Sequence, residues 1–347
     1  MKILLYIAKL YSIPIFRPLV SYLNSEKIEY AFFISSKIEE QFPHDWDRSK
    51  ILNSVKQTRI FNPDFVLVSG NFVDFRIPGV KVQIFHGIGI EKEAHYKIRH
   101  FFDIYLTSGP CVTERFNTLK EQYGYFDVFE TGWLKIDYIL NYDIKSFKPT
   151  FHIPSDKKIV LYAPTFSNRM QSGSEMIERI DEIISDDEFW IIKFHELMDI
   201  NLIRAFKNKK FYNTAIIDDF DITPYLHIAD IMISDTSSVV YEFMALNKPV
   251  ITINTISRPD KGINVFSAAE LRDALNKIKN NPDILAPNIK KHMSEVNPYL
   301  DGNITKKTID LLRNMDKNIY HKKGKPLNLF RKLQVLHHSF FNKGYLR

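Results

Sequence analysis

Short apolar segments alternate along the chain with stretches of helical spacing. Apolar runs bounded by Gly, Pro or Asn predict buried strands, and apolar residues three or four positions apart predict helices, as in Phe16–Leu23 and Thr113–Tyr123. Strands and helices in alternation are typical of the α/β class, in which helices cover a parallel sheet. The predicted strands are residues 3–7, 30–34, 65–68, 80–85, 104–107, 126–129, 159–163, 189–194, 215–217, 231–233 and 250–253.

The alternation is interrupted over residues 141–158, where two prolines and many polar residues indicate a linker. A chain of 347 residues is long enough for two domains. We therefore predict two Rossmann-type domains, residues 1–140 and 159–316, followed by a tail at 317–347. Two such domains leave a central cleft between their parallel sheets, which is the usual place for a ligand.

Positive charge is concentrated in the tail. Residues 317–347 contain eight Lys or Arg and no Asp or Glu, so the chain's net charge of +6 leaves −2 for residues 1–316. The tail also contains several Leu and Phe residues, and this mixture favours contact with an anionic membrane surface. The alternative is a C-terminal helix that packs on the protein with its lysines in solvent. Nucleic acid is not expected as a partner, because the rest of the chain has no basic stripe or recognised motif.

Three features of the sequence bear on location. The segment Met1–Leu10 is apolar only briefly, is interrupted by Lys9 and lacks a small-residue cleavage site, so we interpret it as a strand and not a signal peptide. An apolar run of about 18 residues, which a transmembrane helix needs, is missing from the sequence. The single cysteine, Cys111, fits a reducing compartment. We therefore expect a cytoplasmic protein that is peripheral at the inner face of the cell membrane.

A turn of small polar residues lies between a predicted strand and an amphipathic helix. The N-terminus of a helix attracts anions, because its first N–H groups lack partners within the helix and its dipole favours negative charge. Helix capping is the alternative, but a cap needs only one such side chain. Glu242, further along the helix, is either a solvated carboxylate or a partner for a ribose or base hydroxyl. The residues predicted to bind phosphate are Ser234, Asp235, Thr236, Ser237 and Ser238.

Three further polar groups follow predicted strands, and ligands bind at the carboxyl ends of strands in such sheets. His86-Gly87 follows the strand at 80–85; histidine suits a general base, and a structural turn histidine is the alternative. His195 follows the strand at 189–194. It is followed by Glu196, as in a zinc-binding helix, but the second histidine that such a helix needs is missing, so we predict no metal site. The loop after the strand at 159–163 offers hydroxyls and a guanidinium to a phosphate, from Thr165, Ser167 and Arg169.

In this order and spacing, these segments resemble the bacterial CDP-glycerol glycerophosphotransferase family of teichoic acid and capsule synthesis. The resemblance covers roughly residues 60–315, and its motifs are specific in combination. It rests on His86-Gly87 with Lys92 nearby, Tyr162-Ala-Pro-Thr165, the strand ending in His195, Ser234-Asp-Thr-Ser-Ser238 with Glu242, and Asp301-Gly302-Asn303.

The resemblance implies a GT-B-like fold with an N-terminal domain on the acceptor side and a C-terminal domain that binds the nucleotide donor. Members of the family transfer a polyol phosphate from a CDP-activated donor to a glycan or lipid-linked acceptor, and no cofactor is implied. By the resemblance, His86 is the base that deprotonates the acceptor, with Gly87 and Lys92 close to it. His195, Ser237 and Ser238 are then ligands of the donor phosphates.

Two alternatives have the same fold. A GT-B glycosyltransferase in capsule or lipopolysaccharide synthesis would use a nucleotide sugar at the same phosphate site. A non-catalytic binding protein would keep the fold without the reaction.

Overall fold

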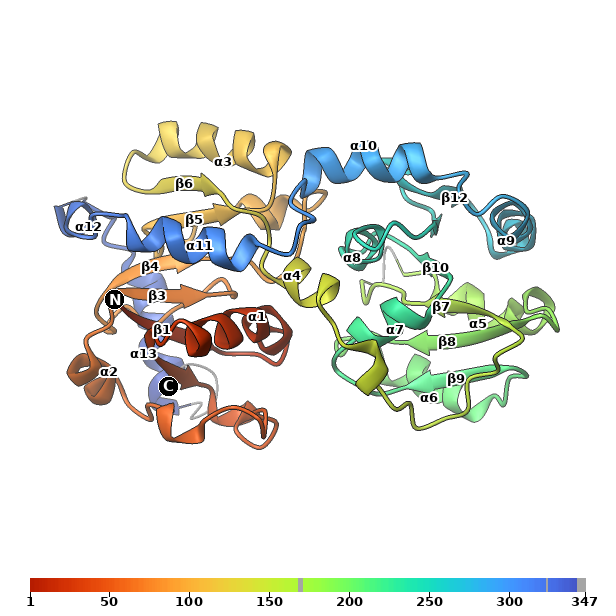
Figure 1. The fold of residues 1–347 in the computed structure, drawn as a ribbon, viewed down its shortest axis with the longest axis horizontal. Helices are drawn as coiled ribbons and strands as arrows, with labels where there is room; N and C mark the ends of the chain where they lie inside the picture. The colour runs from red at the N-terminus through yellow and green to blue at the C-terminus, as the bar shows by residue number, and fades with distance from the viewer. Residues whose placement is uncertain (168–170, 323, 342–347) are drawn as a thin grey trace. The chain divides into compact units, whose positions relative to one another are not determined.

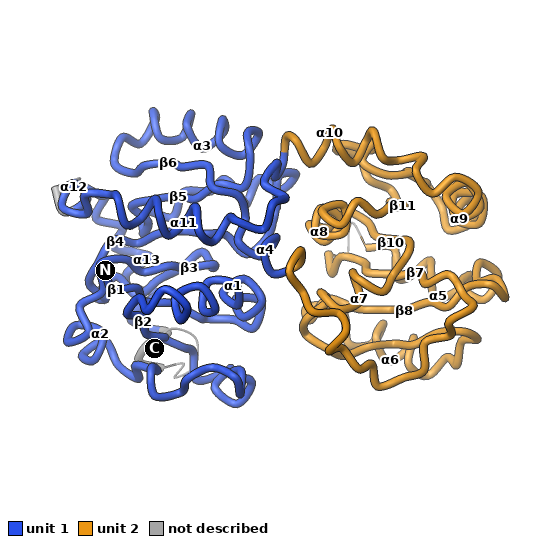
Figure 2. Tube along the Cα trace, in the orientation of Figure 1, with its two compact units in different colours: residues 1–138, 296–347 blue, residues 139–295 orange. Residues whose placement is uncertain are grey.

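The computed structural model describes residues 1–167, 171–322 and 324–341. The chain divides into two compact units, unit 1 with residues 1–138 and 296–347, and unit 2 with residues 139–295 (Figure 2). Each unit contains a six-stranded sheet in which every strand is parallel to its neighbours. The predicted α/β class with two parallel sheets is confirmed, and each predicted strand has a counterpart in the structure.

In unit 1 the strand order is β2-β1-β3-β4-β5-β6, so β1 lies between β2 and β3. Leu4 of β1 is in register with Ala31 on one side and with Val66 on the other. Most strand residues are buried on both faces, which explains why they appear in the sequence as continuous apolar runs. The strands are β1 (Lys2–Ile7), β2 (Glu29–Ile34), β3 (Phe65–Val68), β4 (Val80–Gln83), β5 (Ile104–Thr107) and β6 (Asp127–Glu130).

Helices cover both faces of this sheet. In Figure 1 the helices α1 and α11 lie in front of the strands and α13 lies behind them. Val335 of α13 is fully buried in the same apolar cluster as Leu4 and Val66, so the C-terminal helix completes the core of unit 1. The helices are α1 (Ser12–Ser25), α2 (Val55–Phe61), α3 (Pro110–Tyr123), α4 (Lys135–Leu140, across the boundary with unit 2), α11 (Ile304–Arg313), α12 (Asn318–Lys322) and α13 (Leu329–Phe341).

Unit 2 has the strand order β12-β11-β10-β7-β8-β9, so β7, its first strand, lies between β10 and β8. β12 is not predicted from the sequence, because this strand has only three residues and Asn264 at its centre. The strands are β7 (Lys158–Tyr162), β8 (Glu188–Lys193), β9 (Thr214–Ile217), β10 (Ile231–Ser234), β11 (Val250–Ile253) and β12 (Ile263–Val265). The helices are α5 (Gly173–Ile183), α6 (Ile200–Asn208), α7 (Thr223–Ile228), α8 (Val239–Met244), α9 (Leu271–Asn280) and α10 (Ala286–Val296).

The predicted boundary at residue 316 requires correction, because residues 296–316 belong to unit 1. Asp137 gives the physical reason. Its carboxylate accepts the N–H groups of Ile304 at 3.1 Å and Thr305 at 2.6 Å, the first residues of α11. A carboxylate at a helix N-terminus satisfies otherwise unpaired donors, and here it comes from a residue 167 positions earlier in the chain.

Residues 141–158, predicted as a linker, are part of unit 2. The ring of Phe151 stacks with that of Phe189 at 5.9 Å and with that of Tyr225 at 6.4 Å between centroids. The ring of Tyr142 also stacks with that of His227 at 5.6 Å between centroids. Although this segment is mostly polar, its aromatic side chains pack against unit 2 and attach the segment to it.

Candidate functional site

Three of the predicted site segments lie at the carboxyl edge of the unit 2 sheet. Thr165 follows β7, His195 follows β8, and the turn of residues 234–238 includes the last residue of β10. Because β7 lies between β8 and β10, these segments flank the point where the strand order changes direction. The crevice outside this switch point is where open α/β sheets bind ligands.

The Asp235 carboxylate connects the loop after β10 to the loop after β7. Its Oδ1 accepts the N–H of Thr165 at 2.6 Å, and its Oδ2 accepts the N–H of Ser172 at 3.1 Å and the Ser172 hydroxyl at 3.3 Å. The side chain is fully buried. Desolvation by burial raises the pKa of this carboxyl from 3.8 to about 6, against the hydrogen bonds, which lower it. Asp235 is therefore a clamp between the two loops.

Ser234 is also fully buried, and its hydroxyl donates to the carbonyl oxygen of Ala163 at 2.6 Å. The predicted phosphate contacts of Ser234 and Asp235 thus require correction. Neither side chain reaches the surface, and a carboxylate would repel a phosphate. Both residues instead hold the loops that present the other polar groups.

The remaining turn residues, Thr236, Ser237 and Ser238, are half-buried at the start of α8. Ser238 occupies the N-cap position, yet within the described part of the chain its side chain caps no N–H of the helix. The Ser237 hydroxyl accepts the N–H of Val239 only at 3.5 Å. Since α8 has six residues, its dipole is small, and an anion would depend mainly on the hydroxyl and N–H groups of the turn.

His195 is exposed and presents an N–H donor. Its Nδ1 accepts the N–H of Leu197 at 3.1 Å, so in the neutral ring the proton is on Nε2. The ring centroid lies 4.5 Å from that of Phe166, which restricts the orientation of the imidazole. This geometry suits a hydrogen bond from Nε2 to a phosphate oxygen.

The other predicted residues of unit 2 differ in their exposure. Thr165 is buried, Ser167 is half-buried, and Arg169 lies outside the described residues. Glu242 is 5% exposed, which argues against the solvated carboxylate considered from the sequence. Its place on α8, one turn after Ser238, keeps it close to the hydroxyl turn.

In unit 1, His86 lies shortly after β4, and the residue before it has an unusual backbone conformation. Phe85, directly before it, has φ of 57°, in the left-handed region that aromatic residues rarely adopt. His86 is exposed, and its ring lies 5.1 Å from the ring of Tyr11 between centroids. Desolvation by the surrounding atoms is the main cause that lowers the pKa of His86. A hydrogen bond with the Ser69 backbone opposes it, and the charges of Arg99 and Lys92 lower the pKa further. A neutral imidazole at pH 7 can accept a proton.

Gly87 and Lys92 lie in the same connection, both half-buried. Lys92 precedes the short helix Glu93–Tyr96, and its positive charge lowers the pKa of His86. This helix contains His95, a histidine that pattern reasoning missed. The His95 ring stacks on Phe85 at 4.6 Å, and burial, followed by the neighbouring His86, lowers its pKa to about 3. His95 is therefore a neutral part of the support for the His86 turn.

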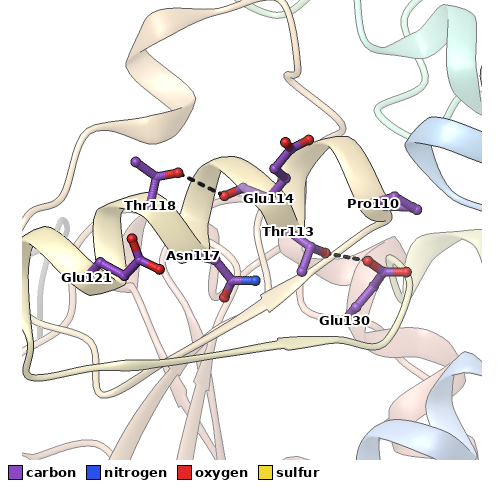
Figure 3. Close-up of a pocket in the computed structure, with 7 residues that line it drawn as sticks. All are labelled: Pro110, Thr113, Glu114, Asn117, Thr118, Glu121 and Glu130. Carbon is purple, nitrogen blue, oxygen red and sulfur yellow. Dashed lines mark hydrogen bonds between the residues drawn. The ribbon is translucent and has the colours of Figure 1, made fainter.

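A surface pocket lies elsewhere in unit 1, along α3 and the end of β6 (Figure 3). Three carboxylates line it, and one of them, Glu130, accepts hydrogen bonds from Thr113 at 2.5 Å and Tyr299 at 2.8 Å. An acidic lining disfavours a phosphorylated donor. The residues of the pocket are Pro110, Thr113, Glu114, Asn117, Thr118, Glu121 and Glu130.

Over the residues that the structure describes, His, Cys, Asp and Glu side chains nowhere gather in threes that could hold a metal ion. No helix within the same residues combines the length and apolar character needed to cross a membrane.

Comparisons with known proteins show which family and which fold this chain is similar to. A sequence profile of the family described as CDP-Glycerol:Poly(glycerophosphate) glycerophosphotransferase matches residues 83–255, about half of the chain. The chain is 26% identical over 225 residues to the teichoic acid glycerol-phosphate primase of Bacillus subtilis, covering 61% of this chain and 58% of that protein. It is 24% identical over 260 residues to the teichoic acid poly(ribitol-phosphate) polymerase of Bacillus spizizenii, covering 66% of this chain and 40% of that protein. The chain thus matches only about half of the length of these relatives.

Solved structures share the fold at low sequence identity. The wall teichoic acid polymerase TagF superposes with a TM-score of 0.67 at 15% identity, over 93% of this chain and 90% of that chain. The UDP co-structure of Staphylococcus aureus MnaA superposes with a TM-score of 0.66 at 15% identity, over 93% and 98% of the two chains. The two parallel-sheet units therefore define a GT-B-like protein with Rossmann-type domains. Within this class, the chain belongs to the CDP-glycerol:poly(glycerophosphate) glycerophosphotransferase family.

Proposed function

We propose that this chain transfers a polyol phosphate from a CDP-activated donor to a hydroxyl group of a cell-surface glycan or a lipid-linked acceptor, with release of CMP. Membership of the family supports the reaction type. The observation that carries the assignment of the site is the Asp235 clamp, which joins the loops after β7 and β10 at the switch point of unit 2. Polar groups converge there, and the Asp235 carboxylate is buried away from the phosphates.

In this proposal unit 2 holds the pyrophosphate of the donor. The hydroxyl turn supplies Ser237 and Ser238, and His195 donates from Nε2 to a phosphate oxygen. These donors compensate the negative charge that develops on the phosphoryl group and on the leaving phosphate. Glu242 accepts hydrogen bonds from hydroxyls of the nucleoside.

Unit 1 supplies the base. The acceptor's oxygen attacks the β-phosphorus of the donor, the bond from that phosphorus to the bridging oxygen breaks, and CMP leaves with the bond electrons. His86 accepts the proton of the acceptor hydroxyl, and its lowered pKa keeps the ring neutral before the reaction.

The test is a donor screen with the purified full chain. Binding of CDP-glycerol, CDP-ribitol and common UDP-sugars is measured by calorimetry, and release of CMP is followed in the presence of a membrane fraction. We expect binding of a CDP-polyol and release of CMP. Binding of a UDP-sugar, with none of either CDP-polyol, contradicts the proposal and favours a glycosyltransferase.

The first prediction concerns His195. Replacement by alanine removes the Nε2 donor, and we expect donor affinity to fall by about tenfold, a loss of about 1.4 kcal/mol. Calorimetric titration with the CDP-polyol measures the effect. His152→Ala, at an exposed histidine of unit 2 that precedes β7, is the control and should bind as the wild type does. Equal donor affinity of His195→Ala and wild type would remove His195 from the site.

We also propose that the C-terminal segment contacts an anionic membrane surface. The packing alternative explains only part of it: Val335 is fully buried, Asn328 Nδ2 donates to the Arg99 carbonyl oxygen at 2.9 Å, and Lys325 pairs with Asp103 at 2.7 Å. The other face of the segment exposes four large apolar side chains. Contiguous apolar exposure beside basic residues suits an interface with anionic lipid. The exposed fractions are 74% for Leu327, 63% for Leu329, 74% for Phe330 and 63% for Leu333.

The second prediction tests this surface. The triple variant Leu329→Ser, Phe330→Ser, Leu333→Ser retains Val335 and the basic residues, so the helix stays docked. We expect its affinity for vesicles of phosphatidylglycerol and phosphatidylcholine to fall by at least about tenfold in a sedimentation assay. Ile60→Ser on α2, where Ile60 is 75% exposed in the same unit, is the matched control. Vesicle binding that is equal in the triple variant and the wild type leaves only the packing role.

A further inference from the structure

We infer that Trp133 is a positioning residue for His86, an inference that rests on the proposed role of His86 as the base. Trp133 does this by a hydrogen bond to the carbonyl group that directly precedes His86. The observations concern unit 1 alone.

The first observation is the conformation of Phe85. A bulky L-residue in the left-handed region is conformationally unfavourable, and it persists only when its surroundings impose it. Phe85 has φ of 57° and is 5% exposed. Its ring packs against His95 at 4.6 Å and against Phe116 at 5.2 Å between centroids. These contacts hold the ring, and a separate contact holds the peptide group.

That contact is the indole of Trp133. Its Nε1–H donates to the carbonyl oxygen of Phe85 at 3.2 Å, and both residues are buried. The carbonyl of Phe85 belongs to the peptide plane that leads into His86. The hydrogen bond therefore determines the direction in which the chain presents the imidazole.

Trp133 is itself held by the part of the chain that returns to unit 1. The Trp133 N–H donates to Asn297 Oδ1 at 2.8 Å, and Asn297 Nδ2 donates to the carbonyl oxygen of Tyr299 at 3.0 Å. Asn297 is fully buried. A continuous path of buried hydrogen bonds thus leads from Asn297 through Trp133 to Phe85.

The Tyr11 ring lies 5.1 Å from that of His86 between centroids and limits its rotation. His86 is thus restrained at its backbone by Trp133 and at its ring by Tyr11. A base must lie within hydrogen-bond reach of the proton it removes, and a displacement of about 1 Å can cost a large part of the rate.

The variant Trp133→Phe tests this inference, because it keeps an aromatic ring and removes only the N–H donor and part of the ring system. We expect the His86 titration, followed by NMR of the histidine C2–H group, to move up toward the ordinary value of 6.5 as water reaches a looser turn. In the transfer assay we expect kcat to fall by about tenfold with the KM for the donor unchanged. In a His86→Ala background, Trp133→Phe should cause no further loss, since it acts through His86.

Trp190→Phe is the matched control. Trp190 is fully buried in unit 2, and its Nε1–H donates to Glu188 Oε2 at 3.0 Å, so the variant removes a bond of the same kind away from His86. It should leave the titration of His86 and kcat unchanged. An unchanged His86 titration in Trp133→Phe, or an equal loss of rate with and without His86, overturns the inference. A His86→Ala variant with full transfer activity overturns the proposed base instead, and the titration still tests the positioning because it needs no substrate.

Discussion

Replacing His86, the proposed base, by alanine should lower kcat for phosphoryl transfer by about 10²- to 10⁴-fold, the usual contribution of a positioned general base. We expect the donor still to bind with wild-type affinity, because the proposed phosphate ligands belong to unit 2. Steady-state kinetics with the CDP-polyol, together with calorimetric donor binding, separate the two effects. His44→Ala is the control, since His44 is an exposed histidine of the same unit in the loop after β2.

The pH dependence gives an independent check of His86. Its pKa is lowered below 6.5, mainly by desolvation, so the neutral base predominates at pH 7. In the wild type, kcat/KM should rise with pH through this lowered pKa and level off above it. The His86→Ala variant should lack that rise. If the His86→Ala variant keeps this rise of kcat/KM with pH, the base is another group.

Replacing Asp235 by alanine destabilises unit 2 by about 3 kcal/mol. The change leaves the N–H groups of Thr165 and Ser172 buried without their acceptor, and each unsatisfied donor costs about 1–3 kcal/mol. We also expect donor binding to weaken by about tenfold, because the loops after β7 and β10 lose their connection. Urea unfolding followed through Trp190, the tryptophan of unit 2, measures the stability.

The pH dependence of this stability distinguishes the clamp from a general packing effect. The folded-state pKa of Asp235 is raised from 3.8 to about 6. Between these values the folded state holds a proton that the unfolded state has lost, so the stabilising contribution declines as pH rises through this window. Each pKa unit corresponds to about 1.4 kcal/mol, which predicts a decline of about 3 kcal/mol that is complete slightly above pH 6. Asp235→Asn cannot titrate and should lack the decline.

An exposed aspartate of the same unit serves as the control for this prediction. Asp186→Ala, on the surface before β8, should unfold at the wild-type urea concentration and bind the donor normally. If Asp235→Ala and wild type have the same stability and the same pH dependence, the carboxylate does not act as a clamp.

The strands and the placement of the polar groups could be predicted because the information is local. A buried parallel strand appears as an apolar run, and the residues after it must lie at the carboxyl edge of its sheet. His86, Thr165, His195 and the hydroxyl turn were located in this way. The resemblance to the family, which rested on the same segments, is confirmed by the match over residues 83–255.

Long-range contacts explain what the sequence could not predict. Asp235 appears among hydroxyl residues as one more phosphate ligand, and only the acceptance of N–H groups from residues 63 and 70 positions earlier shows that it points inward. Asn264 interrupts β12, and the return of residues 296–316 to unit 1 depends on Asp137. No local pattern contains such partners.

By itself, the sequence determined the α/β class, the two parallel sheets and the strand ends that carry polar groups, because strand burial and chain direction are properties of neighbouring residues. The tertiary structure decided which of these groups face a ligand and which hold the loops. Asp235 and Ser234 are buried, so they hold the loops in place and do not contact a ligand. The indole of Trp133 determines how the strained turn at Phe85 presents His86. The orientation of a side chain depends on partners from distant parts of the chain, and these partners are defined only when the chain has folded.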